Sequence, residues 1–188
     1  SICCLDGKLL LLDLHQQRVN DTFEKYFTGV KPVDLSSVLK NVPSEGKFKC
    51  RLVYDQTNVT YSFIAYSNPN IRSFNLVVDD RITYRYKSTD RESLNVLFSK
   101  RGAADDILIV KNGFITDAYF TNLAFYDGNQ WFTPNQPLLK GVKRAHLIAQ
   151  NILIEKEITP TDLACFEQVS FINAMLDLGE VTVGLDQL

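Results

Sequence analysis

The stretch ILIVKNGFITDAYFTNLAFYDGNQWFT, residues 107–133, decides the fold class of this chain. Apolar runs alternate here with two turn dipeptides, Asn112-Gly113 and Asp127-Gly128. Asn-Gly and Asp-Gly between apolar runs are the strongest short-range hairpin signals, because these residues accept the left-handed backbone of tight turns. The pattern predicts an antiparallel meander with strands at 107–110, 114–120, 123–126 and 130–133.

Strands are also predicted in the part of the chain that precedes this meander. Aromatic and β-branched residues fill 48–55, 61–66 and 74–78, which favours antiparallel strands. Residues 81–87 alternate apolar and polar side chains with a period of two, which predicts a strand with two different faces. Lys87 is thereby placed at a strand-to-helix junction.

Helices are predicted where apolar residues recur at intervals of three and four. Capping-box spacing at Asp13 and Gln16, and again at Thr89 and Glu92, marks two helix starts. The predicted helices are 14–27, about 35–41, the segment between Thr89 and Gly102, 141–154 and a short one at 161–165, followed by a strand at 168–175. Because strands are grouped with strands, the fold class is α+β. The polar break at residues 79–81 predicts a domain boundary, with domains at 1–80 and 81–188.

The composition is that of an ordinary globular chain. It has 188 residues, 45% of them hydrophobic, with 20 Lys and Arg against 22 Asp and Glu. A chain of this length buries about 70% of its surface on folding, so a core forms without disulfides or metals. With a net charge of −2, we expect neither nucleic acid nor an anionic membrane as a partner.

The cysteines and the N-terminus bear on metal content and location. The four cysteines form no CxxC pair and the two histidines have no metal-ligand spacing, so we expect no zinc site. The apolar run Leu9–Leu12 is too short for a signal peptide or a membrane span. We therefore expect a cytoplasmic protein with reduced thiols. Because the chain begins at Ser1 without Met, we also expect a few residues to precede it.

Two residues stand out as candidates for chemistry. Lys87 ends an apolar-faced strand, where an ammonium can be partly desolvated and suited to imine formation. The alternative is a solvated lysine whose stem alone is buried. Asp117 alternates with Ile115 and Tyr119 on one strand face, where an acid is disfavoured unless a cation meets it. Its alternative is an aspartate at a strand edge or facing solvent.

Other candidates carry weaker signals. Gly141 and Val142 open a helix whose free N–H groups can bind a phosphate, although an ordinary helix start has the same sequence. Arg18 projects about 125° away from the apolar face of its helix, which favours a solvated arginine. His15 and His146 have no nucleophile in a recognisable context, so a catalytic triad has no support.

Several segments occur together in one order, and the chain thereby resembles the fold-type IV pyridoxal-phosphate enzymes. This group contains branched-chain aminotransferase, D-amino-acid aminotransferase and aminodeoxychorismate lyase. The resemblance covers nearly the whole chain and is sharpest from about residue 81 to 175. The segments that carry it are His15-Gln16-Gln17-Arg18, Tyr86-Lys87-Ser88-Thr89-Asp90-Arg91, Asn112-Gly113-Phe114-Ile115-Thr116-Asp117 with Thr121-Asn122-Leu123, Trp131-Phe132-Thr133-Pro134, Leu138-Leu139-Lys140-Gly141-Val142-Lys143-Arg144 and Ile172-Asn173-Ala174-Met175.

The resemblance implies a fold, a cofactor and roles for single residues. It implies a small N-terminal α/β domain and a larger antiparallel, barrel-like cofactor domain. Lys87 would hold pyridoxal 5'-phosphate as a Schiff base and move the proton at the substrate carbon. Asp117 would pair with the pyridinium nitrogen, which helps the ring to accept electrons. The phosphate would be held by Arg18, Asn173 and the helix start formed by Gly141, Val142 and Lys143.

The chain departs from the pattern of this group at three places. Asp117 stands where Glu is usual and is one methylene shorter. Lys143 stands where Thr is frequent, which exchanges a hydroxyl for a cation near the phosphate. The strands that normally precede the phosphate-binding arginine are expected to be nearly absent.

The resemblance also implies a reaction and an assembly. The Lys87-x-x-x-Arg91 spacing and the short chain favour aminodeoxychorismate lyase, which releases pyruvate and 4-aminobenzoate for folate synthesis. The alternatives are a branched-chain or D-amino-acid aminotransferase, and a degenerate member that kept only the scaffold. The sequence does not identify the proton donor to the leaving group. The partner set implied is a small amino substrate and a second copy of the chain, in a homodimer with the site near the interface.

Overall fold

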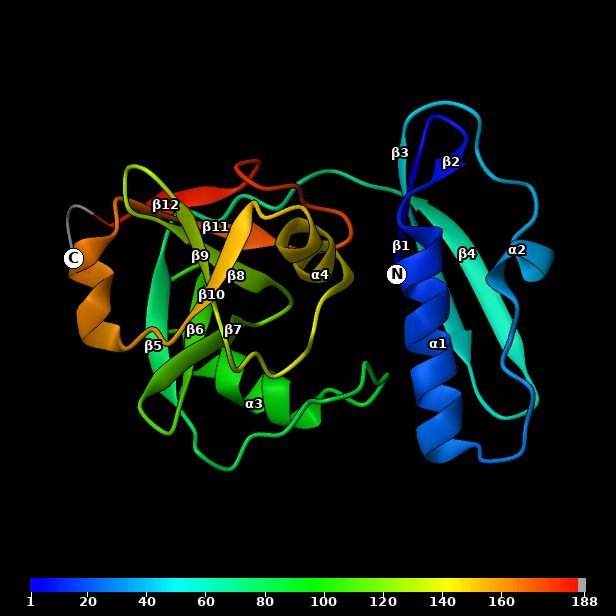
Figure 1. The fold of residues 1–188 in the computed structure, drawn as a ribbon, viewed down its shortest axis with the longest axis horizontal. Helices are drawn as coiled ribbons and strands as arrows, with labels where there is room; N and C mark the ends of the chain where they lie inside the picture. Colours follow the sequence, from blue (N-terminus) through cyan, green and yellow to red (C-terminus); the bar gives the residue numbers. More distant parts are fainter. Residues whose placement is uncertain (186–188) are drawn as a thin grey trace. The chain divides into compact units, whose positions relative to one another are not determined.

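The computed structural model describes residues 1–185, which divide into two compact units, 1–67 and 68–185 (Figure 1). The division between the units, after residue 67, comes earlier in the sequence than the boundary expected between residues 80 and 81. The difference arises because the strand Phe74–Val78 pairs with a strand of the second unit. The mixture of helices and sheets in both units confirms the α+β fold class.

The first unit is a four-stranded antiparallel sheet with one long helix. Its elements are β1 (Ile2–Leu5), β2 (Lys8–Leu9), α1 (Leu12–Tyr26), α2 (Leu35–Val38), β3 (Lys47–Tyr54) and β4 (Val59–Ala65), and the strand order is β2-β1-β3-β4. Val19 and Phe23 of α1 pack with Ile2 and Cys50 of the sheet in a buried core. Burial of this apolar surface is the main force that holds the helix on the sheet.

Two details of the first unit differ from expectation. Helix α1 begins at Leu12 because Leu11 adopts a left-handed backbone with φ of 53°, so Asp13 lies in the first turn and does not cap the helix. Gln16 instead accepts a hydrogen bond from the Leu35 N–H at 2.8 Å, which fastens α1 to α2. The strands expected to be nearly absent are present as β1 and β2.

The second unit contains two sheets and two α-helices. Its elements are β5 (Phe74–Val78), α3 (Glu92–Ser99), β6 (Asp106–Lys111), β7 (Phe114–Ala118), β8 (Asn122–Tyr126), β9 (Trp131–Pro134), α4 (Val142–Ala149), β10 (Leu153–Lys156), the 3-10 helix η1 (Pro160–Cys165), β11 (Gln168–Ile172) and β12 (Thr182–Gly184). The strand orders are β5-β6-β7 and β10-β9-β8-β11-β12.

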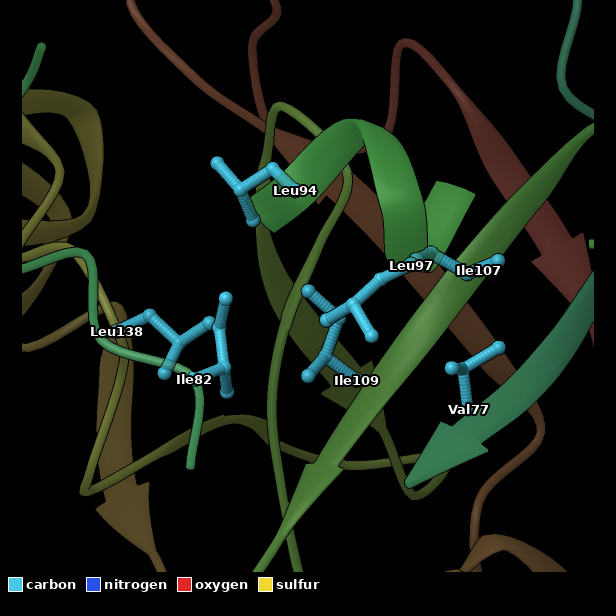
Figure 2. Close-up of a cluster of buried hydrophobic side chains, with 7 residues drawn as sticks. All are labelled: Val77, Ile82, Leu94, Leu97, Ile107, Ile109 and Leu138. Carbon is cyan, nitrogen blue, oxygen red and sulfur yellow. The ribbon is translucent and has the colours of Figure 1, made fainter. Parts of the chain in front are cut away.

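Each sheet of the second unit has its own helix. Leu94 and Leu97 of α3 pack on Ile107 and Ile109 of β6, together with Val77, Ile82 and Leu138, as Figure 2 shows. Leu147 of α4 packs with Ala124, Leu153 and Ile172 on the five-stranded sheet. These two cores fix the strands that carry the candidate site.

Both hairpins of the predicted meander are present, but the prediction that its four strands follow one another in a continuous meander is wrong. The pairs β6–β7 and β8–β9 are antiparallel, but β7 and β8 belong to different sheets. The chain reverses after β7, where the Ala118 N–H donates to Thr121 O at 3.0 Å. Strand β8 then pairs with β11. Likewise β5, expected to be antiparallel, is parallel to β6.

Three further expectations in the second unit are corrected. Residues 81–87 form no strand, because the Asp79 carboxylate accepts the N–H groups of Arg81 and Ile82 and turns the chain. The helix predicted to reach 154 ends at Ala149, since Asn151 has a φ of 57° and the chain continues as β10 beside β9. The last predicted strand ends at Ile172, and β12 was not predicted.

Within residues 1–185, no helix has the length and apolarity needed to cross a bilayer. None of the four cysteines forms a disulfide, and all four lie within the described residues.

Candidate active site

Asp117 is the centre of the candidate site. It lies on β7 with 5% of its surface exposed, so the alternative of a solvent-facing aspartate is wrong. Its Oδ1 accepts a hydrogen bond from Asn122 Nδ2 at 2.5 Å, and its Oδ2 accepts one from the Leu139 N–H at 3.0 Å. The carboxyl is thereby fixed in orientation by donors from two neighbouring segments.

The charged form of Asp117 is disfavoured by burial, and its hydrogen bonds and a nearby positive charge offset this effect only in part. Burial raises its pKa to about 6, although hydrogen bonds from Leu139 and Asn122 and the charge of Arg144 act in the opposite direction. A cation placed at this carboxyl would favour its charged form and lower the pKa again. The site is therefore suited to bind a cationic group.

Asn122 joins Asp117 to the start of α4. Besides its bond to Asp117, its Nδ2 donates to Leu139 O at 2.8 Å. Its Oδ1 lies where a Cβ on Gly141 would be, so only glycine fits at this helix start. The close approach explains Gly141 better than an ordinary helix start does.

Helix α4 presents its first-turn N–H groups beside this cluster. Gly141 is the N-cap, and the N–H groups of Val142 and Lys143 belong to the first turn, which has no intrahelical acceptors. The Lys143 side chain turns toward Asp177 and forms an ion pair at 2.9 Å. Any contribution of Lys143 to anion binding therefore comes through its backbone N–H and the field of its charge.

Arg144 holds α4 on β9. This arginine is 4% exposed and donates to Thr133 Oγ1 at 3.2 Å, to Pro134 O at 2.8 Å and to Glu155 Oε1 at 2.6 Å. No role was predicted for Arg144 from the sequence, because a buried arginine on a short helix has no distinctive local pattern. It fixes the direction in which the α4 N-terminus points.

Asn173 uses its side chain to shape a turn. Its Oδ1 accepts the N–H groups of Met175 at 2.7 Å and Leu176 at 3.1 Å. Its Nδ2 donates to Phe120 O at 3.5 Å, which links this turn to the end of β7. The same turn leads to Asp177, the partner of Lys143.

Thr121 is a residue of the candidate site for which no role was predicted from the sequence. It is 4% exposed, and its hydroxyl has no hydrogen-bond partner among residues 1–185. Buried hydroxyls are almost always paired in proteins. The Thr121 hydroxyl therefore has a hydrogen-bonding capacity that the described protein atoms leave unused.

Lys87 lies on the irregular segment between β5 and α3, and its side chain is exposed. Residues 81–87 leave the sheet and do not carry the lysine along a buried strand face, so its role toward a cofactor stays a prediction. The segment is joined to the site by Arg91, which donates to Tyr119 O at 2.7 Å.

Arg18 lies on α1 of the first unit and is half-buried. Its role toward a phosphate stays a prediction. Four of the expected site residues contact neighbouring segments of the second unit. Asp117 and Gly141 both contact Asn122, Lys143 is paired with Asp177, and Asn173 is bonded to Phe120.

Comparison with known proteins shows the family to which the chain belongs. The family model described as amino-transferase class IV matches residues 2–183, so the chain belongs to the class IV aminotransferases. The resemblance stated from the sequence is confirmed, and the protein is an enzyme of this family.

Three similar proteins bear on the particular activity. A Haemophilus somnus crystal structure, provisionally named a 4-amino-4-deoxychorismate lyase, is 34% identical, with 94% of this chain and 95% of that chain covered and a TM-score of 0.89. A Schizosaccharomyces pombe protein, provisionally named aminodeoxychorismate lyase, is 26% identical over 90% of this chain and 82% of its own length. A Mesorhizobium loti structure, provisionally named an amino-acid aminotransferase, shares the fold at 20% identity, with 97% and 95% coverage and a TM-score of 0.82.

Proposed function

We propose that this enzyme is a pyridoxal-phosphate-dependent aminodeoxychorismate lyase that releases pyruvate and 4-aminobenzoate. The observation that carries the proposal is the 34% identity, over nearly the full length of both chains, to a protein provisionally given that activity. A second relative with the same provisional name supports it. The Lys87-x-x-x-Arg91 spacing, which resembles the lyases, points in the same direction.

The residues of the second unit fit the proposed cofactor. Asp117 offers a buried, oriented carboxyl with no ion-pair partner among the described contacts, as a pyridinium nitrogen requires. The Thr121 hydroxyl is unpaired, and the α4 N-terminus at Gly141 offers N–H groups that suit a phosphate dianion. A buried acid, an unpaired buried hydroxyl and a helix N-terminus in the same unit support binding of a ring that carries a phosphate.

Each residue then has a defined task. When bound, pyridoxal phosphate supplies an electron sink that stabilises negative charge at the substrate carbon. Lys87 would hold the cofactor through its Nζ, and the same Nζ, as a neutral amine, would take the proton from the substrate carbon next to the amine. Asp117 would hold a proton on the ring nitrogen. The N–H groups of Val142 and Lys143, with Asn173, would hold the phosphate. A role of Arg18 toward the phosphate rests on the resemblance alone.

The main alternative is a branched-chain or D-amino-acid aminotransferase. The family to which the chain belongs is named for this activity, and the Mesorhizobium loti protein shares the fold. An aminotransferase uses the same lysine and acid but returns the amine to a keto acid. A catalytically degenerate scaffold is the further alternative, in which the phosphate is bound while Lys87 is unused.

The test compares the two reactions on one preparation. Aminodeoxychorismate is supplied with pyridoxal phosphate, and pyruvate and 4-aminobenzoate are followed together. Parallel assays use branched-chain or D-amino acids with 2-oxoglutarate. We expect equal amounts of the two lyase products and no amino transfer, and Lys87→Ala should abolish both products. Transfer to 2-oxoglutarate without 4-aminobenzoate would refute the lyase.

The cofactor itself has a separate test. Adding pyridoxal phosphate to the wild type should produce the visible absorbance band of a lysine-bound cofactor, and borohydride should fix the cofactor to Lys87. Lys87→Ala should show neither. A wild type that binds phosphate but shows no band would support the degenerate scaffold.

We further propose that the enzyme acts as a homodimer in the cytoplasm. The homodimer follows from the resemblance, which places the site near an interface between copies. The cytoplasmic location is supported by the four cysteines, none of which forms a disulfide and three of which are buried.

A further inference from the structure

The segment that carries Lys87 belongs to neither a helix nor a strand, so its position depends on side-chain contacts. At its start, Lys111 Nζ donates to Ile82 O at 2.6 Å, and the Ile82 side chain is buried in the core of the three-stranded sheet (Figure 2). Segments without a backbone ladder lie at the low-stability end of a structure unless such contacts hold them. The first end of this segment is therefore fixed.

The residues on either side of Lys87 are closed into a small loop. The Tyr84 hydroxyl donates to Ser88 O at 2.9 Å and accepts the Ser88 N–H at 3.2 Å. Two hydrogen bonds on one hydroxyl thus join the residues before and after Lys87. The loop has a defined shape, but these bonds alone do not connect it to Asp117.

Arg91 makes that connection. Its guanidinium donates to Tyr119 O at 2.7 Å and lies over two rings, 4.7 Å from the centroid of Tyr119 and 5.7 Å from that of Tyr84. A charge-assisted hydrogen bond combined with cation–π contacts is among the stronger ways to fix a loop. Arg91 therefore joins the loop around Lys87 to the residue that lies two positions after Asp117.

Tyr119 is itself held from several directions. Its N–H donates to Asp106 Oδ1 at 3.3 Å, and its hydroxyl donates to Asn95 Oδ1 at 2.7 Å. Its ring is stacked on Phe98 of α3 with the centroids 4.1 Å apart. Tyr119 is thus a rigid point of the scaffold, fixed to β6 and to α3.

We propose that Arg91 and Tyr119 form a clamp, the Arg91–Tyr119 clamp, that fixes Lys87 relative to Asp117. Both are positioning residues, because they act through the backbone of the residues that would touch the cofactor. The inference rests on the proposed function, in which one cofactor ring is attached at Lys87 and paired at Asp117. The length of that ring system requires the two groups to keep a constant separation.

The chain provides a matched control for the clamp. Arg101 is also half-buried, lies over the Phe98 ring at 4.2 Å and donates to the Phe98 carbonyl at 3.3 Å. It belongs to the same aromatic cluster but makes these contacts within α3 and its C-terminal turn. Arg101→Met therefore removes a similar arginine–ring contact without releasing the Lys87 segment.

The experiment compares Arg91→Met, Arg91→Lys and Arg101→Met with the wild type. The first readout is the pH titration of the visible absorbance band of cofactor bound at Lys87. The dissociation constant of pyridoxal phosphate is measured on the same variants, and so are the kcat and KM of whichever reaction the wild type catalyses. Amide hydrogen exchange of peptides within 81–91 is measured on the protein without added cofactor. Thermal unfolding reports global stability.

In Arg91→Met we expect faster exchange in 81–91, a shifted pH titration of the band and about tenfold lower kcat with KM within about twofold. Arg91→Lys keeps a cation and one donor and should recover part of each effect. Arg101→Met should match the wild type in exchange, titration and kcat. Similar thermal unfolding of the two methionine variants would exclude a general loss of stability.

Two outcomes would overturn the clamp. One is an Arg91→Met protein whose titration and exchange equal those of the wild type. The other is an Arg101→Met protein with the same changes as Arg91→Met. If the wild type shows no visible band, the proposed function fails, and exchange in 81–91 still decides whether Arg91 holds the segment.

Discussion

At the scale of the single residue, Asp117 makes stability depend on pH. Its folded-state pKa is about 6, against an ordinary value of 3.8, because burial disfavours the charged form. Between these values the folded chain holds a proton that the unfolded chain has lost. The free energy of unfolding therefore falls as the pH rises from about 4 to about 6. Asp106, buried at the start of β6, also has its pKa raised to about 6 and acts with the same sign.

Asp117→Asn should remove the contribution of Asp117 to this fall of the free energy of unfolding with pH. The amide cannot ionise, but it offers only one acceptor oxygen to Asn122 and Leu139. We expect a loss of about 1 kcal/mol at pH near 4 and a flatter dependence up to pH about 6. Urea unfolding from about pH 4 to 7 without cofactor measures both. Asp106→Asn should remove the contribution of Asp106 to the pH dependence and leave that of Asp117. An unchanged pH dependence in Asp117→Asn would contradict the raised pKa of Asp117.

A second prediction at this scale concerns the contact between Gly141 and Asn122. A methyl group at Gly141 meets Asn122 Oδ1, so the amide must rotate away from Asp117 and from Leu139 O. We expect Gly141→Ala to destabilise the chain by about 2 to 3 kcal/mol. Urea unfolding of the variant against the wild type gives this value.

Asn122→Ala provides the control for that prediction. Truncating Asn122 removes the atom with which the new methyl group collides. The double variant should therefore be more stable than the sum of the two single losses predicts. Additive losses would show that Gly141→Ala acts through another contact.

The site was predictable from sequence where a residue has a local pattern. Asp117 stands out because it interrupts an apolar strand face, and Gly141 because it precedes a helix. Asn122 and Thr121 have no such signal, since their roles depend on β7 and β8 lying in different sheets. The unpaired Thr121 hydroxyl becomes visible only when all neighbouring atoms are placed.

At the scale of elements, errors of prediction came from partners distant in sequence. The apolar residues after Ala149 continue the helical spacing, but residues 153–156 have β9 beside them and form a strand. Residues 81–87 keep their alternation, with Ile82 buried and Lys87 exposed, although no neighbouring strand pairs with them. An alternating pattern indicates which face of the segment is buried. It does not indicate whether a neighbouring strand is available for hydrogen bonding.

The prediction at this scale concerns the link between α4 and the turn that follows β11. The Lys143 side chain is 9% exposed, whereas that of its partner Asp177 is 59% exposed. Asp177→Asn leaves a nearly buried ammonium without its counter-charge, while Lys143→Met leaves a carboxylate that water can solvate. We expect Asp177→Asn to cost about 1 to 2 kcal/mol and Lys143→Met less than about 1 kcal/mol.

Urea unfolding at neutral pH measures this order, and added salt provides its control. Asp177 is largely exposed, so salt should reduce the difference between wild type and Asp177→Asn. A larger loss in Lys143→Met would indicate that packing of the lysine stem matters more than its charge. The dissociation constant of pyridoxal phosphate should change less in Lys143→Met than in Gly141→Ala, because the helix N–H groups remain.

At the scale of the whole molecule, the family was predictable from the order of its segments, whereas the boundary between the units was not. The polar break at 79–81 is a turn that the Asp79 carboxylate forms inside the second unit. The units instead divide at Ser67 and Asn68, in an irregular stretch between β4 and β5. Parallel pairing of β5 with β6 is a contact between distant residues, and local composition does not reveal it.

The last prediction is the assembly. Lys87 is exposed in the single chain, yet the proposed chemistry at its amine benefits from the exclusion of water. A second copy that covers this segment would supply the missing protection. Light scattering at micromolar concentration should therefore give about twice the chain mass of 21.4 kDa. Labelling of Lys87 by an amine reagent should slow, relative to the exposed Lys100, as concentration rises and the dimer forms. A monomer at these concentrations, or a constant labelling ratio across the dimerisation range, would contradict a dimer that covers Lys87.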